Sequence, residues 1–276
     1  PLNVLYISQL AKQNGVKVLL SGAGGDDLFT GYRRHHALLL EKWWRWLPGG
    51  MRAGLDKAAS RLDQRRAWLR RLAKLFNGAG LDGDTNIANY FLWAREADLL
   101  SLYTPEVRAQ LREARAAQPL VDFLGSAPDG LSRLERMLLL EQRFFLADHN
   151  LTYTDKMSMA AGVETRVPFL DLDLVEFAAR IPPSYKQRGS TGKWVLKKAM
   201  EPYLPHDVIY RPKTGFGAPL RRWMRYELRE FMGDLLSEES LKRRCLFDPA
   251  AVQRMIAAND AGRVDASYTL LSLLCI

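Results

Sequence analysis

The sequence has little cysteine and no segment that marks export or membrane insertion. Its two cysteines, Cys245 and Cys275, lie far apart and form no CxxC pair, so neither a disulfide framework nor a zinc site is indicated. No apolar run reaches the roughly 18 residues that a membrane helix needs, and the first residues lack the basic start of a signal peptide. We expect a cytoplasmic protein without a membrane partner. The sequence does not begin with methionine, so we expect it to be a piece of a longer chain.

The sequence has fewer acidic than basic residues. The 31 Asp and Glu residues stand against 40 Lys and Arg residues, which gives a net charge of +9. This balance suits acidic small molecules, nucleotides, nucleic acid or an anionic membrane and selects none of them. A basic enzyme is the interpretation that we favour. With 276 residues, 47% of them hydrophobic, the chain can bury a large core in one or two domains.

The first part of the sequence predicts a helix, a strand, a loop and a second helix. Leu2 to Asn14 carries an apolar stripe at helical spacing and ends at Gly15. Val16 to Leu20 is short, apolar and rich in valine, which is typical of a buried parallel strand. A glycine-rich loop follows, and a helix is expected from about Asp27. This order is that of an open α/β sheet.

The remainder of the sequence is almost entirely helical in pattern. Helices are expected at 131–148, 172–180, 193–202, 249–259 and 267–275, and Thr104 is expected to cap a helix that begins with Pro105. One helical segment is expected to carry an apolar stripe on one side and a basic stripe on the opposite side. The apolar residues are Leu62, Trp68, Leu69, Leu72 and Phe76, and the basic ones are Arg65, Arg66, Arg70, Arg71 and Lys74. The loop-rich stretch Asn77–Asn86 is expected to separate two helical groups. The chain therefore predicts the later part of an α/β domain, strongly helical, whose first strands lie upstream.

The loop after the first strand, SGAGG at Ser21–Gly25, suits an anionic ligand. Its glycines let backbone N–H groups approach one point, and the helix N-terminus behind them favours negative charge. Asp26 and Asp27 would repel a phosphate unless Mg²⁺ lies between, since this ion prefers hard oxygen ligands. The alternative is a plain turn in which Asp26 or Asp27 caps the helix. The pattern GxxxxGK[ST] is absent, so this is not a P-loop.

A second cluster of charges lies in DKMSMAAGVETRVPFLD, which begins at Asp155. Glu164, Arg166 and Asp171 surround an apolar segment that contains a proline. Charges this close to apolar residues suggest a buried ion network. The interpretation that we favour is structural: Arg166 pairs with Glu164 or Asp171 and pins the loop. We expect these residues and Asp155 to support a site and not to contact its ligand.

Two later glycine-containing segments add cations. In RGSTGKWVLKKAM a flexible loop is expected to open a helix with Lys193 in its first turn. A lysine there opposes the helix dipole, and it is better tolerated where it reaches an anion. Lys197 and Lys198 are expected to be plain surface charges. Arg211 and Lys213 in YRPKTGFGAPL are either anion contacts or parts of a solvated loop.

Four motifs occur along the sequence in this order: LSGAGGDDLFTGY, DKMSMAAGVETRVPFLD, TGKWVLKKA and RPKTGFGAPL. Together they resemble the synthetase domain of the glutamine-hydrolysing, B-type asparagine synthetases, in the PP-loop ATP pyrophosphatase superfamily with its HUP-like parallel sheet. The resemblance covers nearly all of residues 1–276 and is weakest between about 41 and 131. It implies a carbon–nitrogen ligase that uses ATP and Mg²⁺ to activate a carboxylate, aspartate in the family's namesake reaction, as an acyl-adenylate. Ammonia from glutamine then gives the amide and AMP.

The resemblance also implies roles for individual residues. Four loop residues are implied to contact ATP: Ser21, Gly22, Ala23 and Gly24. Asp26 resembles an aspartate that binds Mg²⁺, and Lys193 resembles the lysine that holds the phosphates and stabilises charge in both steps. These roles fit the chemistry, because adenylation concentrates negative charge on the α-phosphate and the leaving pyrophosphate.

The sequence departs from the family pattern in two ways. It lacks the SGGxDS pyrophosphate loop and the N-terminal cysteine of the glutaminase, both upstream in the family. We therefore expect a glutaminase domain in the same full-length chain, a homodimer as a candidate assembly, and no activity from this piece alone. Ala23 stands where asparagine-forming members usually carry a glutamate that handles a proton of the attacking ammonia. The substrate could therefore be another carboxylate: a sugar uronate, a peptide or a natural product.

A function of another class is binding without catalysis. Trp43, Trp44 and Trp46, followed by the basic stretch Arg61–Lys74, suit an anionic membrane or a nucleic acid. We favour the tryptophans as core or interface anchors and the arginines as a solvated face, and we expect no nucleic-acid partner. A decayed synthetase kept for its interactions is disfavoured by the intact loop and lysine.

Overall fold

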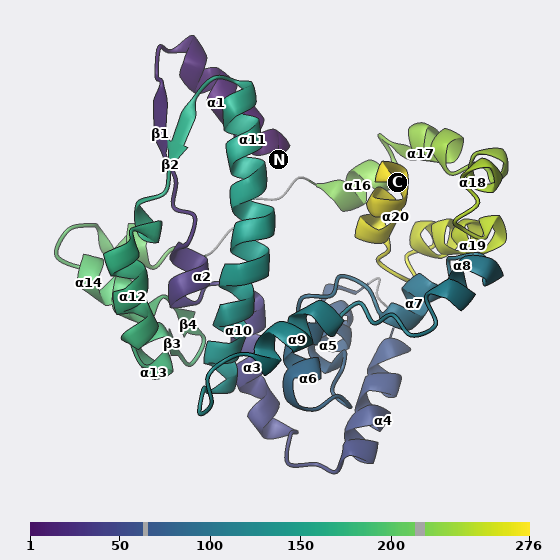
Figure 1. Cartoon of the computed structure of the whole chain (residues 1–276), viewed down its shortest axis with the longest axis horizontal. Coiled ribbons are helices and arrows are strands. Elements are labelled where there is room, and N and C mark those ends of the chain that lie inside the picture. The colour runs from purple at the N-terminus through teal and green to yellow at the C-terminus, as the bar shows by residue number, and fades with distance from the viewer. Residues whose placement is uncertain (63–65, 213–218) are drawn as a thin grey trace. The chain divides into compact units, whose positions relative to one another are not determined.

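The computed structural model describes residues 1–62, 66–212 and 219–276, and these are largely helical (Figure 1). The chain forms two compact units, residues 1–43 with 124–216 and residues 44–123 with 217–276. Within the described ranges no helix combines the length and the apolar character needed to cross a bilayer. That residues 1–276 form one partial synthetase domain stays a prediction.

The first unit contains two small two-stranded sheets and a set of helices. Before the second unit branches off it has α1 (Leu2–Gln13), β1 (Val18–Leu20), α2 (Gly25–Phe29), α3 (Arg33–Leu40) and the 3-10 turn η1 (Glu41–Trp43). After the chain returns through α9 (Gln118–Gly125), it has α10 (Arg133–Leu140), the π-helix η2 (Glu141–Leu151), α11 (Thr152–Ala160), β2 (Glu164–Arg166), η3 (Pro168–Leu170), α12 (Leu172–Arg180), α13 (Pro183–Lys186), β3 (Gln187–Arg188), β4 (Thr191–Gly192), α14 (Trp194–Met200) and α15 (His206–Ile209).

The strand after α1 is parallel, as the sequence predicts, but it is not buried. β1 pairs with β2, with Leu19 opposite Thr165. Val18 is 39% exposed and Leu20 is 74% exposed, so the predicted burial is wrong. Within the described ranges this sheet has two strands, with α11 packed beside β2 and α1 packed on α11, and the strands are not enclosed between helical layers. The sheet agrees with an α/β class, and the PP-loop fold itself stays a prediction.

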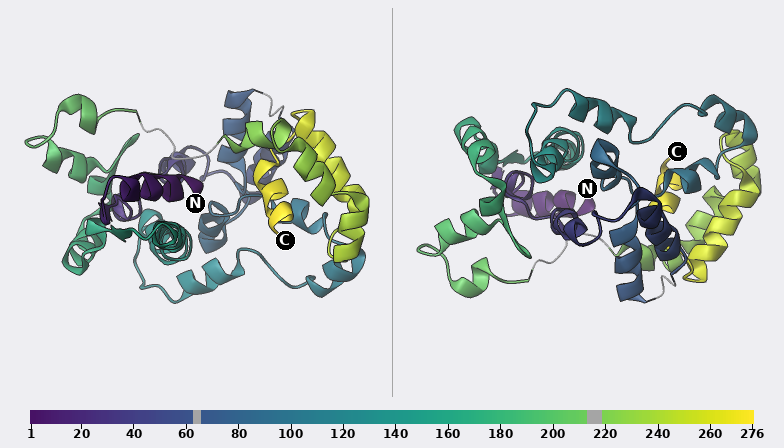
Figure 2. Two further views of the ribbon diagram at one scale, coloured as in Figure 1. Left: turned by 90° about the horizontal axis from the view of Figure 1, so that it is seen from above. Right: turned by 90° about the horizontal axis from the view of Figure 1, so that it is seen from below.

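A long helical rod runs through α10, η2 and α11; Figure 1 shows it lengthwise and Figure 2 nearly end-on. It begins at a capping box, in which the Ser132 hydroxyl accepts from the Glu135 N–H and the Glu135 carboxylate accepts from the Ser132 N–H. The predicted end at Asp148 is too early. Residues 149–160 contain no glycine or proline that would stop a helix, and the rod ends where Gly162 adopts φ +70°.

The second unit is a helical bundle with its own core. It consists of α4 (Gly49–Ser60), α5 (Ala67–Phe76), α6 (Gly83–Asn89), α7 (Glu96–Leu100), α8 (Pro105–Gln110), α16 (Leu220–Arg225), α17 (Arg229–Leu235), α18 (Glu238–Arg244), α19 (Pro249–Asp260) and α20 (Ser267–Cys275). Met224, Leu236, Leu241, Val252 and Leu270 are completely buried together. The Thr104 cap is confirmed, because its side chain accepts from the Val107 N–H.

The structure differs from three sequence predictions for the middle of the chain. Trp43 and Trp46 are 69% and 76% exposed, so they do not anchor a core, and their role as interface anchors stays a prediction; Trp44 packs on Phe76 with ring centroids 5.0 Å apart. The 77–86 stretch does not separate helical groups, because α5 before it and α6, which begins within it, lie in one unit. The apolar stripe loses Leu62, which precedes α5; Arg65 lies outside the described residues.

Candidate functional site

The glycine loop is held against η3 by close packing. The Ser21 N–H donates to the Arg166 carbonyl at 2.8 Å and continues the parallel pairing beyond β1. Gly24 precedes α2 with φ +91°, and a Cβ there would lie 2.5 Å from Leu170 Cδ2. A larger residue would therefore be strained at this φ and would require the Leu170 side chain to move. The Ala23 N–H donates to the Ser21 hydroxyl at 3.2 Å, which tightens the turn from within.

Asp26 and Lys193 meet beside this loop. Asp26 lies in the first turn of α2, and Lys193 immediately precedes α14. Lys193 Nζ lies 2.9 Å from Asp26 Oδ1, with the two side chains 30% and 24% exposed. Gly31 makes room for the carboxylate, since a Cβ there would lie 1.7 Å from Asp26 Oδ1. The site thus presents one carboxylate and one ammonium group that solvent can reach.

The segment before Lys193 forms a hairpin where the sequence predicts a flexible loop. Its backbone forms the antiparallel hairpin β3–β4, in which Gln187 pairs with Gly192. The Gln187 side-chain amide donates to the Gly189 carbonyl at 2.9 Å. The Lys193 N–H donates to the Phe29 carbonyl at 3.0 Å, so the hairpin is attached to the end of α2. These hydrogen bonds place the backbone of Lys193 next to the end of α2.

Asp27, the residue after Asp26 in α2, is buried. It is 1% exposed, and burial raises the pKa of its carboxyl to about 6, with the charge of Glu141 acting in the same direction. The Tyr32 hydroxyl donates to Asp27 Oδ1 at 3.2 Å and accepts from the Asn150 side-chain amide at 3.3 Å. Burial and the nearby Asp27 raise the pKa of the Tyr32 hydroxyl. Asp27 is therefore built into the support of the loop.

Glu141 joins the rod to the start of α3 through Arg34 and His35. Its side chain is 0% exposed; it accepts a bidentate pair of hydrogen bonds from the Arg34 guanidinium and one at 2.8 Å from His35 Nε2. His35 Nδ1 accepts from the Gly31 N–H at 3.0 Å, so the hydrogen-bond network assigns the ring proton to Nε2. The Arg34 guanidinium also stacks over the Tyr32 ring at 4.5 Å. This network fixes the turn that follows α2.

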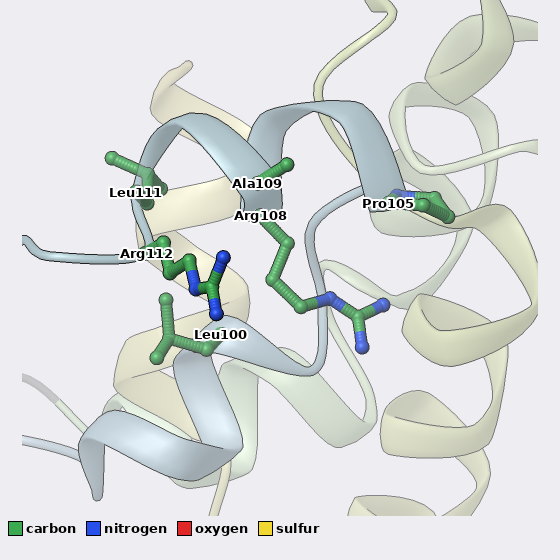
Figure 3. A pocket seen from close by; sticks show the side chains of 6 residues that line it. All are labelled: Leu100, Pro105, Arg108, Ala109, Leu111 and Arg112. Carbon is green, nitrogen blue, oxygen red and sulfur yellow. The ribbon is translucent and has the colours of Figure 1, made fainter.

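A separate pocket of about 450 Å³ lies in the second unit, at α7 and α8 (Figure 3). Its lining residues are Leu100, Pro105, Arg108, Ala109, Leu111 and Arg112. They include no carboxylate, imidazole, thiol or hydroxyl. This pocket therefore lacks the groups for acid–base or nucleophilic chemistry, in contrast to the Asp26–Lys193 site.

Comparison with known proteins decides the family. The family model described as asparagine synthase matches residues 2–276. The chain belongs to the asparagine synthase family. A provisionally named glutamine-hydrolysing asparagine synthetase of Mycobacterium tuberculosis (strain H37Rv) is 30% identical over 98% of this chain and 40% of its own length. Glutamine-hydrolysing asparagine synthetase 1 of Bacillus subtilis is 28% identical over 84% of this chain and 35% of its own length.

A third relative of this chain is named an amidase and not an asparagine synthetase. Amidase chyE of Penicillium rubens is 23% identical over 91% of this chain and 39% of its own length. The chain thus spans about two fifths of the length of the curated relatives that it matches. No solved structure matches. The family uses ATP, and its longer relatives contain further sequence beyond the part matched here.

The support residues predicted from the second motif do not form a buried ion network. Arg166 Nε donates to Glu164 Oε1 at 2.8 Å, but the two side chains are 62% and 55% exposed, so the buried network is wrong and the structural pairing is right. The pair is exposed because it lies on β2 in a sheet that is not enclosed. The Asp171 carboxylate instead accepts from the Leu174 N–H and caps α12. Asp155 is exposed on α11.

The other predicted cations divide into three cases. Lys193 meets Asp26, as described above. Lys198 is a surface charge, as predicted, and pairs with Glu201 at 2.8 Å. Arg211 is exposed, and Lys213 lies outside the described residues, so their role as anion contacts stays a prediction.

Sequence reasoning missed Thr30, His35 and Glu141. A signal for Glu141 exists: it continues the buried stripe of Leu134 and Leu138, so it is an acidic residue at a core position of the helix. A buried acid requires a partner, and this requirement points to a basic residue elsewhere. The identity of that residue depends on a pairing 106 residues apart and has no local signal.

Proposed function

We propose that this chain is the synthetase part of a longer ATP-dependent ligase that converts a carboxylate to an amide. The observation that carries the proposal is the pair of Asp26 and Lys193, which meet 2.9 Å apart at a glycine loop. Family membership supports it. Because the chain spans about two fifths of its relatives, the activity, a glutaminase domain in the same full-length chain and a homodimer are all parts of this proposal.

The residues of the site fit ATP with Mg²⁺. Magnesium is usually held by one or two protein carboxylates, with phosphate oxygens and water completing its shell. Asp26 can supply one carboxylate. In the described part of the chain no group of three or more His, Cys, Asp or Glu side chains could hold a metal alone, which is compatible with an ion shared with phosphates. When bound, Mg²⁺ would neutralise phosphate charge next to the loop.

Lys193 is suited to act on the phosphates. Its ammonium group also lies close to the first turn of α2, 3.7 Å from where a Cβ of Gly25 would be. A cation fixed there lowers the barrier for a carboxylate to attack the α-phosphorus while pyrophosphate leaves, because negative charge develops on the phosphate oxygens. Ser21 and Gly22 would hold phosphate oxygens through the loop. Attack of ammonia on the acyl carbon would then release AMP and form the amide.

The substrate carboxylate is the open part of the proposal. Aspartate follows from the resemblance, with asparagine as product. Ala23 favours a second candidate, another carboxylate such as a sugar uronate, a peptide or a natural product, because its methyl group cannot take the proton that the usual glutamate takes. The Penicillium relative, which is named an amidase, supports a wider range of substrates in the family.

The first experiment measures AMP and pyrophosphate release by the full-length protein with ATP, Mg²⁺ and either glutamine or ammonia. We expect carboxylate-dependent release, and asparagine formation if aspartate is the substrate. Lys193→Ala should lower kcat about 100-fold or more. Lys198→Ala, on the same helix but paired with Glu201 at the surface, should retain activity. A Lys193→Ala variant as active as wild type, or no AMP from ATP with a broad panel of carboxylates, would overturn the proposal.

A further inference from the structure

Thr30 adopts a backbone conformation that is unusual for a branched residue. Its φ is +66° and its ψ is 138°, directly after α2. This region of backbone space is accessible chiefly to glycine, because a Cβ clashes with the neighbouring backbone there. Thr30 is also completely buried. A strained residue persists where the surrounding contacts hold it in place.

The Thr30 hydroxyl uses both its donor and its acceptor capacity. It donates to the Lys186 carbonyl at 2.9 Å, and it accepts from the Lys193 N–H at 3.3 Å. The Lys193 N–H is shared with the Phe29 carbonyl at 3.0 Å. The hairpin packs so closely that a Cβ on Gly192 would lie 3.1 Å from the Thr30 carbonyl oxygen. Thr30 thus joins the end of α2 to both ends of the β3–β4 hairpin.

The hydrogen bond from Lys193 to Thr30 involves the backbone of the same lysine whose side chain pairs with Asp26. Lys193 is itself left-handed, with φ +55° and ψ 33°, at the contact with Thr30. Its side chain reaches Asp26 on the same helix that Thr30 ends. The direction of the Lys193 side chain depends on its backbone angles, and these depend on where its N–H is held. Without the Thr30 hydroxyl, the Lys193 N–H would keep one acceptor, the Phe29 carbonyl, in place of two.

We propose that Thr30 is a positioning residue that holds the Lys193 backbone against α2 and so sets the approach of Lys193 to Asp26. The effect on catalysis rests on the function proposed above. The structural part does not, because it concerns hydrogen bonds within this chain. The expected effect of losing the hydroxyl is local: the hairpin end opens more often, and Lys193 spends less time beside Asp26.

The test uses three substitutions in the full-length protein. Thr30→Val keeps the shape and removes the hydroxyl, and Thr30→Ser restores the hydroxyl without the methyl group. Thr30→Gly removes the hydroxyl and also relieves the left-handed strain, so it folds even if the valine variant does not. Thr191→Val is the matched control, because it makes the same chemical change on the same hairpin at a hydroxyl that makes no hydrogen bond in the described part of the chain.

The first readout is amide hydrogen exchange in the segment that contains Lys193. We expect exchange about three- to tenfold faster for the valine and glycine variants, the size of one lost hydrogen bond. The serine variant and the Thr191→Val control should exchange like wild type. Unchanged exchange in Thr30→Gly, at a melting temperature equal to or above that of wild type, would overturn the proposal.

The second readout is steady-state kinetics. We expect kcat to fall about three- to tenfold in Thr30→Gly with a smaller change in the KM for ATP, because Lys193 acts mainly on developing charge. Recovery in Thr30→Ser would support positioning. If wild type has no ligase activity, the proposed function fails while the exchange measurement still decides the role of Thr30. Faster exchange with unaltered kcat would remove the catalytic part of the proposal.

Discussion

Replacing Glu141 with glutamine removes a buried negative charge on which Arg34 and His35 depend. Glu141 is 0% exposed and accepts three hydrogen bonds, two from Arg34 and one from His35. A glutamine can still accept from His35 Nε2 through its carbonyl oxygen. Its NH₂ group would face an N–H group of Arg34, a donor against a donor, and the guanidinium would lose its counter-charge.

The size of the effect follows from burial. Breaking a buried ion pair by removing one partner costs about 3–5 kcal/mol, because the remaining charge is uncompensated. Arg34 is 18% exposed and keeps some hydration, so we expect the lower end, about 3 kcal/mol. Adding Arg34→Met to Glu141→Gln should recover part of this loss, since the unpaired charge is then removed. The double variant is therefore expected to be more stable than Glu141→Gln alone.

Urea unfolding of the full-length protein, followed by circular dichroism, measures the difference. The matched control is Glu176→Gln, the same substitution in a pair with Arg180 whose side chains are 70% and 78% exposed. Exposed pairs of this kind contribute little, so we expect no measurable change in the control. The reasoning would be refuted if Glu141→Gln unfolded at the same urea concentration as Glu176→Gln.

Two further predictions concern Asp27 in α2 and Gly31, which follows α2. Because the pKa of Asp27 is raised to about 6, the folded state binds more protons than the unfolded state between about pH 4 and 6, and stability should fall by about 2–3 kcal/mol as pH rises through this window. Asp27→Asn should remove this slope in urea titrations, and an identical slope in the variant would contradict it. Gly31→Ala would place a methyl group 1.7 Å from Asp26 Oδ1, so we expect about tenfold weaker binding of ATP with Mg²⁺ by calorimetry. Gly233→Ala, where a Cβ meets nothing within 4 Å, should bind as wild type does; equal affinity of the two variants would show that Asp26 is not needed.

The sequence was informative where structure depends on neighbours along the chain. The bounds predicted for α12 and α20 are those observed, because apolar spacing is a local signal, to which α12 adds the Asp171 cap. The same applies to the Thr104 cap and to the Arg166–Glu164 pair, two residues apart. The glycine loop between a strand and a helix was also recognisable from its residues. The roles of its side chains in binding ATP stay a prediction.

Long-range pairings account for what the sequence did not predict. β2 was missed because three residues carry almost no periodicity, and its strand character comes from pairing with β1. β1 is exposed within residues 1–276, and a valine-rich run does not indicate how much of a strand the rest of its sheet covers. The contact between Thr30 and Lys193 joins residues 163 positions apart, so nothing local indicates it.

The Thr-Gly step after α2 shows why local rules fail at this site. Among the described residues, three non-glycine residues have positive φ, and two of them, Thr30 and Lys193, share one hydrogen bond. A rule based on residue type would assign the left-handed conformation to Gly31, since glycine adopts it without a steric penalty. Gly31 is instead needed for its missing Cβ, which leaves room for the Asp26 carboxylate. The positive φ then falls on Thr30, whose hydroxyl holds Lys193, so the strain lies where the carboxylate and the ammonium group are brought together.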